Sequence, residues 1–296
     1  MTISPRDMRL RIPGFRRYAA ELERLRGHEG ALEAMRQQLE KAEREVRVLS
    51  GARGLAPGND AGVDDAEWTT RARKYEYYWL NADKKIDLLE MRPFGALASE
   101  VLRDGRTFLN ADRLYTLWQA VAHMPAGAAA VAEVGVYRGG SARFLAEALR
   151  AVDRVMPLYA CDTFDGHAAV DESVDGRHKV QKQFAGVNTS RIAKYLKRYD
   201  FVHIVEGDIA QTAARFEDQH AFGLVHIDVD VYPATGFCLE FFAPRLLVGA
   251  TIVVDDYGFT TCRGAKKAVD EFVAANSKQY WAMHLLTGQA VLTRLA

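Results

Sequence analysis

Near the N-terminus, apolar residues recur at alternating spacings of three and four among Glu, Arg, Lys and Gln. This series includes Leu25, Leu32, Leu39 and Val46. Such a heptad-like pattern predicts a long helix that forms a coiled coil, so we expect residues 1–50 to assemble the protein into a homo-oligomer. A single helix that packs on its own domain is the alternative.

A change of composition separates this segment from the rest of the chain. Residues 51–66 are rich in Gly, Asp and Ala, which is typical of a linker. Residues 67–126 form a predicted helical cap region, with helical patterns that stop at Pro93 and Pro125. The remaining residues, 127–296, form the predicted main domain.

In the main domain, short apolar runs alternate with helical patterns. The runs are AAVAEVG, PLYACDTF, FVHIVEGD, GLVHIDVDV and ATIVVDD. Strands and helices in turn predict βαβ units and an α/β fold with a doubly wound, Rossmann-like parallel sheet that binds ligands at the carboxyl ends of its strands. The last two runs, YWAMHLL and QAVLTRL, flank a TGQ turn and predict an antiparallel hairpin at one edge.

Composition and charge narrow the classes of partner. The chain has 39 Lys and Arg against 39 Asp and Glu, so it lacks the basic excess of a nucleic-acid binder. No apolar run reaches the roughly 18 residues of a membrane span, and the N-terminus lacks the apolar core of a signal peptide. We expect a cytoplasmic protein without a transmembrane segment. Peripheral contact of its basic N-terminal arm with the inner membrane surface is an open alternative. The three cysteines, Cys161, Cys238 and Cys262, have no metal-binding spacing and are predicted to be buried free thiols.

The first loop of the main domain, AEVGVYRGGSARF, indicates the cofactor. A dinucleotide loop needs G-x-G-x-x-G, but here Glu133 stands at the first position and Arg138 at the last. A carboxylate beside a pyrophosphate is unfavourable, whereas beside the cationic groups of S-adenosylmethionine it is favourable. The loop therefore favours S-adenosylmethionine over NAD, with Glu133, Gly135, Gly139 and Ser141 as cofactor-binding residues and Ser141 as the expected N-cap of the next helix.

Two further acids follow the next two strands. Asp162 stands about twenty residues after the loop, where it can accept hydrogen bonds from ribose hydroxyls, and Asp208 is suitably placed for an adenine amine. Each acid alone is a weak signal, because an Asp after a strand is often only a helix cap. Their order on consecutive strands favours cofactor binding.

The fourth and fifth predicted strands both end in acids. Asp228 follows one strand, Asp255 and Asp256 follow the other, and neighbouring strands would bring all three together. Two unit charges about 4 Å apart repel by roughly 4 kcal/mol at an effective dielectric constant of about 20, so the trio calls for a cation. Oxygen ligands alone favour Mg²⁺, with Mn²⁺ or Ca²⁺ as substitutes. Asp230 could take the acceptor proton as general base, or it could cap the helix that is predicted to start near Pro233.

Taken together, these motifs resemble the macrocin O-methyltransferase (TylF) family of class I, metal-dependent sugar O-methyltransferases. The resemblance covers roughly residues 107–275 and rests on AEVGVYRGGSA, DTFDG, EGDI, HIDVDVYPAT, PRLLVGATIVVDDYG and GAKKAVDEF. It implies a seven-stranded sheet, S-adenosylmethionine as methyl donor and Mg²⁺. By matching positions it implies metal ligands at Asp228, Asp255 and Asp256, and a proton acceptor at Asp230.

The resemblance implies a sugar or glycosylated product as acceptor, while a catechol or another small molecule remains an alternative. His167 and His178 lie after the second strand, either as acceptor contacts or as solvated loop residues. Two other classes of function stay open. One is a coiled-coil scaffold whose cofactor-binding domain has no turnover, and the other is an NAD-dependent oxidoreductase, which Glu133 disfavours.

Overall fold

A seven-stranded sheet forms the centre of the computed structural model, which describes residues 88–176, 180–216 and 218–296. The predicted coiled coil in residues 1–50, the linker 51–66 and His178 lie outside the described residues. The described residues belong to the compact unit Ile86–Ala296.

The strand order is β3-β2-β1-β4-β5-β7-β6. The first five strands run parallel, and β7 pairs antiparallel with both β5 and β6. Their bounds are β1 Ala130–Val134, β2 Leu158–Asp162, β3 Val202–Glu206, β4 Phe222–Ile227, β5 Leu246–Val254, β6 Tyr280–His284 and β7 Ala290–Arg294. This arrangement confirms the predicted doubly wound sheet and its antiparallel edge hairpin.

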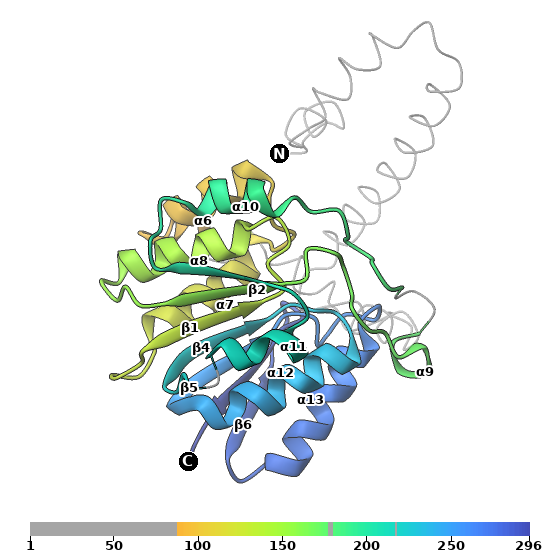
Figure 1. Ribbon diagram of the computed structural model, residues 1–296. Helices are drawn as coiled ribbons and strands as arrows, with labels where there is room; N and C mark the ends of the chain where they lie inside the picture. Colours follow the sequence, from red (N-terminus) through yellow and green to blue (C-terminus); the bar gives the residue numbers. More distant parts are fainter. Residues whose placement is uncertain (1–87, 177–179, 217) are drawn as a thin grey trace, which may run out of the picture. The chain divides into compact units, whose positions relative to one another are not determined.

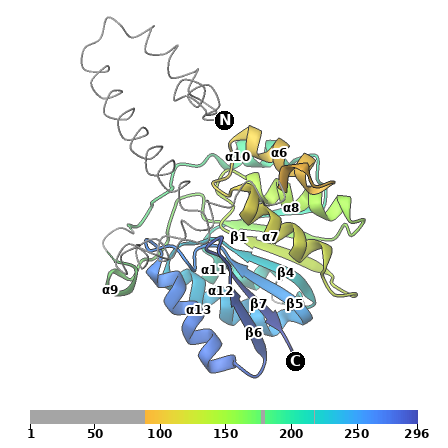
Figure 2. The same ribbon diagram turned by 180° about the vertical axis from the view of Figure 1, so that it is seen from behind.

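Helices cover both faces of the sheet (Figures 1 and 2). One face carries α6 Phe94–Asp104, α7 Ala111–Ala122, α8 Gly140–Ala151 and α10 Thr189–Leu196. The other carries α11 Ile209–Thr212, α12 Tyr232–Phe242 and α13 Arg263–Asn276. The described residues also contain four short helices: η2 Leu88–Glu90, α9 Glu172–Asp175, η3 Ala213–Phe216 and η4 Ala243–Arg245.

The central strands are buried on both faces, which explains their nearly continuous apolar sequence. Every residue of β1 and β4 is buried. Phe144 and Leu145 of α8 fill the layer on one side, while Phe222 of β4 and Phe242 of α12 fill the other. Each such side chain contributes roughly 1.5–3 kcal/mol by leaving water.

The two helices before β1 pack against α8. Helix α7 lies within the predicted helical stretch, and both α6 and α7 contact α8. Helix α6 begins directly after Pro93, inside the predicted helical cap region but between its two individually predicted helices. Its buried Phe94, Ala98 and Val101 follow the i, i+4, i+7 spacing of a helix, so the signal was present.

Across the described residues, none of the helices combines the length and the apolar character that crossing a membrane requires.

Candidate functional site

A pocket of about 520 Å³ opens at the carboxyl ends of the parallel strands. It includes the loops after β1 and β4, between which the strand order reverses. Backbone hydrogen bonds join the ends of neighbouring strands. The Asp228 N–H donates to the Val134 carbonyl of β1 at 2.8 Å, and the Asp255 N–H donates to the Ile227 carbonyl of β4 at 2.9 Å. The volume of the pocket lies within the range of about 300–1,000 Å³ that is common for ligand sites.

The glycine loop after β1 depends on two left-handed backbone conformations. Gly135 has φ +97°, and a Cβ there would overlap the carbonyl oxygen of Asp228. Gly139 has φ +85° and is the N-cap of α8. The prediction that Ser141 caps this helix is therefore wrong, because α8 already begins at Gly140. Ser141 instead lies in the first turn, buried, and lines the pocket.

Glu133 lies below the pocket, inside the sheet. It is completely buried, and its Oε1 lies 3.0 Å from Nδ1 of His226 on the neighbouring strand β4. Within the part of the chain that the structure describes, its second oxygen has no hydrogen-bond partner and its side chain does not line the pocket. Burial alone would lower the pKa of His226, but Asp255 and Glu133 on either side raise it to about 9. The predicted role of Glu133 toward the cofactor stays a prediction.

Asp162 and Asp208 both line the pocket. Asp162 accepts backbone N–H groups from Val136 and Tyr137, each at 2.7 Å, and from Phe164 at 2.6 Å. Burial raises the pKa of Asp162 although these donors favour its charged form. Asp208 caps α11, as the helix-cap interpretation expects, while it also faces the pocket. Asp208 can therefore cap α11 and line the pocket at the same time.

The structure brings the three predicted metal ligands together. Asp228, Asp255 and Asp256 each offer one carboxylate oxygen within 4.8 Å of the others. Burial, together with the charges of Asp255, Asp256 and Asp230, raises the pKa of Asp228 well above its usual range. We call Asp228, Asp255 and Asp256 the acid cluster. Its three carboxylates and all-oxygen donor set fit a hard divalent cation.

Three residues that the sequence analysis missed surround Asp255. Arg113 of α7 forms an ion pair with its Oδ2, Gln289 Nε2 donates to its Oδ1 at 2.9 Å, and His226 Nε2 lies 3.7 Å from Oδ1. Burial alone would raise the pKa of Asp255, but His226, Arg113 and Gln289 lower it. Arg113 stands 142 residues from Asp255, so no local pattern links the two.

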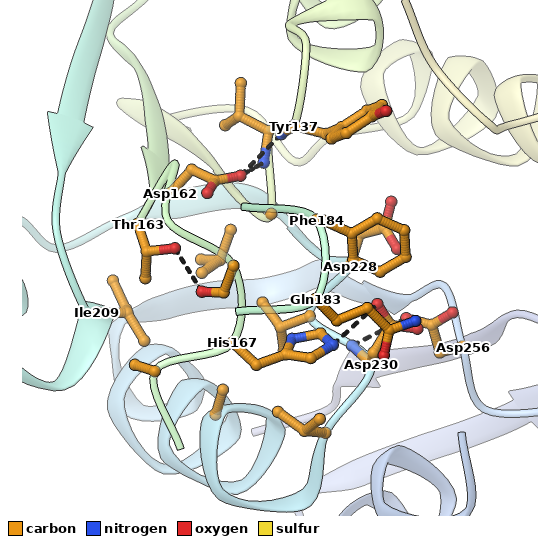
Figure 3. A pocket seen from close by; sticks show the side chains of 18 of the residues that line it. Tyr137, Asp162, Thr163, His167, Gln183, Phe184, Ile209, Asp228, Asp230 and Asp256 are labelled. Carbon is orange, nitrogen blue, oxygen red and sulfur yellow. Dashed lines mark hydrogen bonds and ion pairs between the residues drawn. The ribbon is translucent and has the colours of Figure 1, made fainter. Parts of the chain in front are cut away.

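Asp230 lies beside the acid cluster but in an unusual backbone conformation. The extended geometry of β4 ends at Ile227, and Asp230 has φ +64°. Its N–H donates to Asp256 at 3.1 Å, and the Cys262 thiol lies 3.1 Å from its Oδ1. Figure 3 shows His167 pointing toward Asp230, with 3.9 Å between His167 Nε2 and Asp230 Oδ2.

The helix-cap interpretation of Asp230 is not what the structure shows. The N-cap of α12 is Val231, and the Tyr232 N–H donates to the buried Asp175 at 2.7 Å. The carboxylate of Asp230 is therefore not used to start the helix. Among the described residues that line the pocket, Asp228, Asp230 and Asp256 supply carboxylates from the two loops after β4 and β5.

Aromatic rings form another part of the pocket wall. Phe108 and Tyr137 stack with their centroids 5.2 Å apart, and Phe184 packs against Tyr137 at 5.9 Å and against His167 at 5.8 Å. Cys161, Cys238 and Cys262 are all buried and form no disulfide among the described residues, as predicted.

Residues 132–257 match a family model described as "Methyltransferase domain". The matched range runs from within β1 to just beyond the end of β5. It therefore contains the glycine loop, Asp162, Asp208 and the acid cluster.

Curated relatives are O-methyltransferases. A Streptomyces olivaceus protein named 8-demethyl-8-(2,3-dimethoxy-alpha-L-rhamnosyl)-tetracenomycin-C 4'-O-methyltransferase is 27% identical over 142 residues, which cover 45% of this chain and 54% of the relative. Mycinamicin III 3''-O-methyltransferase of Micromonospora griseorubida is 29% identical over 149 residues, which cover 46% of this chain and 58% of the relative. The chain thus spans little more than half the length of these relatives.

Solved structures share the fold. The O-methyltransferase NovP superposes with a TM-score of 0.55 at 23% identity, covering 64% of this chain and 82% of its own. CalS11, a calicheamicin methyltransferase, superposes with a TM-score of 0.54 at 21% identity, covering 81% of this chain and 98% of its own. The family match and the curated relatives support the predicted S-adenosylmethionine-dependent O-methyltransferase, while the narrower assignment to the macrocin family stays a prediction.

Proposed function

We propose that this protein transfers a methyl group from S-adenosylmethionine to a hydroxyl of a sugar or glycosylated small molecule, assisted by a divalent cation such as Mg²⁺. The observation that carries the proposal is the convergence of three carboxylates beside the glycine loop, where the strand order reverses. The matched methyltransferase domain supports the reaction class. The relative named for a rhamnosyl tetracenomycin supports the acceptor class.

S-adenosylmethionine supplies an electrophilic methyl group when it is bound. Gly135 and Ser141 would line its binding site near the first turn of α8, and Asp162 and Asp208 would accept hydrogen bonds from its ribose and adenine. The backbone N–H groups of Val136 and Tyr137, which donate to Asp162, also keep the glycine loop close to β2. A single acid thus both shapes the loop and faces the pocket.

A divalent cation held by Asp228, Asp255 and Asp256 would lower the pKa of an acceptor hydroxyl and orient its oxygen. Asp230 would then accept the proton that leaves this hydroxyl. The hydrogen bond from the Asp230 N–H to Asp256, together with the contact from the Cys262 thiol, holds Asp230 next to the cluster. Proton acceptance by a residue so positioned typically accelerates a reaction by about 10²–10⁴-fold.

Calorimetric titration with S-adenosylmethionine and, separately, with Mg²⁺ tests both ligands. We expect the wild-type protein to bind both, and Asp255→Asn to bind Mg²⁺ at least about tenfold more weakly with its S-adenosylmethionine affinity retained. The exposed Asp200 offers a control, and Asp200→Asn should behave as wild type. Unchanged Mg²⁺ binding in Asp255→Asn would contradict the metal site, and failure of the wild type to bind S-adenosylmethionine would contradict the cofactor assignment.

A further inference from the structure

Arg113 already provides a positive charge at the acid cluster. It reaches from the first turn of α7, pairs with Asp255 Oδ2 and also donates to the Phe108 carbonyl. Its side chain is 13% exposed, whereas Asp255 is fully buried. The contact is therefore a largely desolvated ion pair, in which the loss of either partner leaves an uncompensated buried charge.

The environment of Asp255 fixes this pair in place. Gln289 donates both to Asp255 Oδ1 at 2.9 Å and to the Arg113 carbonyl at 3.4 Å. The Arg113 guanidinium also lies 5.4 Å from the Phe259 ring centroid. Contacts from α7, the turn before β7 and the loop after β5 thus hold the guanidinium on the same carboxylate that the proposed metal site requires.

We propose that Arg113 is an internal counter-cation that competes with a divalent metal ion for Asp255. The inference rests on the proposed metal site. A guanidinium and a divalent cation that share one buried carboxylate repel each other, so metal binding must loosen or break the Arg113 contact. Arg113 therefore weakens the metal affinity of the acid cluster and stabilises the cluster when the metal concentration is low.

Mg²⁺ titration of the full chain after EDTA treatment and gel filtration tests this inference. Arg113→Gln removes the charge, and we expect its Mg²⁺ dissociation constant to fall at least about fivefold. Arg113→Lys keeps the charge and should stay within about twofold of wild type. Arg113→Met, a second neutral variant with an unbranched side chain, serves if Arg113→Gln fails to fold.

Arg106 offers a matched control. It lines the same pocket, but its guanidinium lies over the Tyr195 ring, 4.3 Å from the centroid. Arg106→Gln should therefore leave Mg²⁺ affinity unchanged.

A second readout is thermal unfolding, in which Mg²⁺ should raise the melting temperature of Arg113→Gln by more than that of wild type.

The outcomes separate this inference from the proposed function. Tighter Mg²⁺ binding by the neutral variants supports competition, even if the wild type itself binds no Mg²⁺. Equal or weaker binding by the neutral variants, or no binding by any variant, overturns it. S-adenosylmethionine titration of the same samples tests the cofactor site independently.

Discussion

Gly135 sets how closely the loops after β1 and β4 approach. Its φ of +97° and the overlap that a Cβ would make with the Asp228 carbonyl predict that Gly135→Ala is strongly destabilising. We expect the free energy of unfolding to drop by about 2 kcal/mol or more, with a loss of S-adenosylmethionine affinity. Urea unfolding and calorimetry measure the two effects.

The matched control is Gly236→Ala. Gly236 lies within α12, where a Cβ would meet no atom within 4 Å. This variant should be neutral or more stable by about 0.5–1 kcal/mol, because alanine favours a helix. Equal effects of the two substitutions would contradict the close-approach role of Gly135.

A second prediction for a single residue concerns Asp230. Asp230→Asn keeps the size of the side chain, but its amide is too weak a base to take the proton from the acceptor hydroxyl. We expect kcat to fall by about 10²–10⁴-fold, while the affinities for S-adenosylmethionine and Mg²⁺ change by less than about threefold. Asp165→Asn, at an exposed acid paired with Lys182, is the control and should retain turnover. Undiminished turnover in Asp230→Asn would exclude Asp230 as the general base.

Between elements, Asp104 joins three helices. It ends α6, pairs with Arg143 of α8 and accepts the Tyr195 hydroxyl of α10 at 2.6 Å. Burial alone would raise the pKa of Asp104, but Tyr195 and Arg143 lower it below its ordinary 3.8. Its stabilising effect should therefore be complete above about pH 4 and be lost as the pH falls through the lowered pKa.

The comparison of wild type with Asp104→Asn tests this pH dependence. We expect the difference in unfolding free energy to be about 1 kcal/mol near pH 7, because solvent screens a carboxylate that is one-third exposed. The difference should shrink below pH 4 in urea unfolding. A difference that grows on acidification would contradict the assignment.

Across the whole molecule, local patterns predicted the strands, the edge hairpin and the acids that follow the strands. These features depend on residues close together in sequence, and parallel strands bring their carboxyl ends to one edge. Arg113 and Gln289 could not be predicted in this way, because α7 and the turn before β7 reach Asp255 only through tertiary packing. The N-cap of α8 was predicted at Ser141, but the helix already begins at Gly140. Gly139, in the left-handed conformation, is its N-cap, and a serine at an N-cap did not distinguish these positions.

At the same scale, the site gathers its charges from several distant segments. The acid cluster comes from the ends of β4 and β5, and its counter-charges come from α7 and β4. The proposed metal-assisted methyl transfer would therefore depend on the integrity of the whole sheet rather than on one loop.

Turnover in the presence and absence of a chelator tests metal-assisted methyl transfer most directly. Labelled S-adenosylmethionine would be incubated with glycosides that carry free sugar hydroxyls, first with Mg²⁺, then with EDTA, and then with Mg²⁺ restored. We predict sugar O-methylation with Mg²⁺, a loss of at least about 100-fold with EDTA, and recovery on restoration. Methyl transfer that continues at the same rate in EDTA would contradict the account.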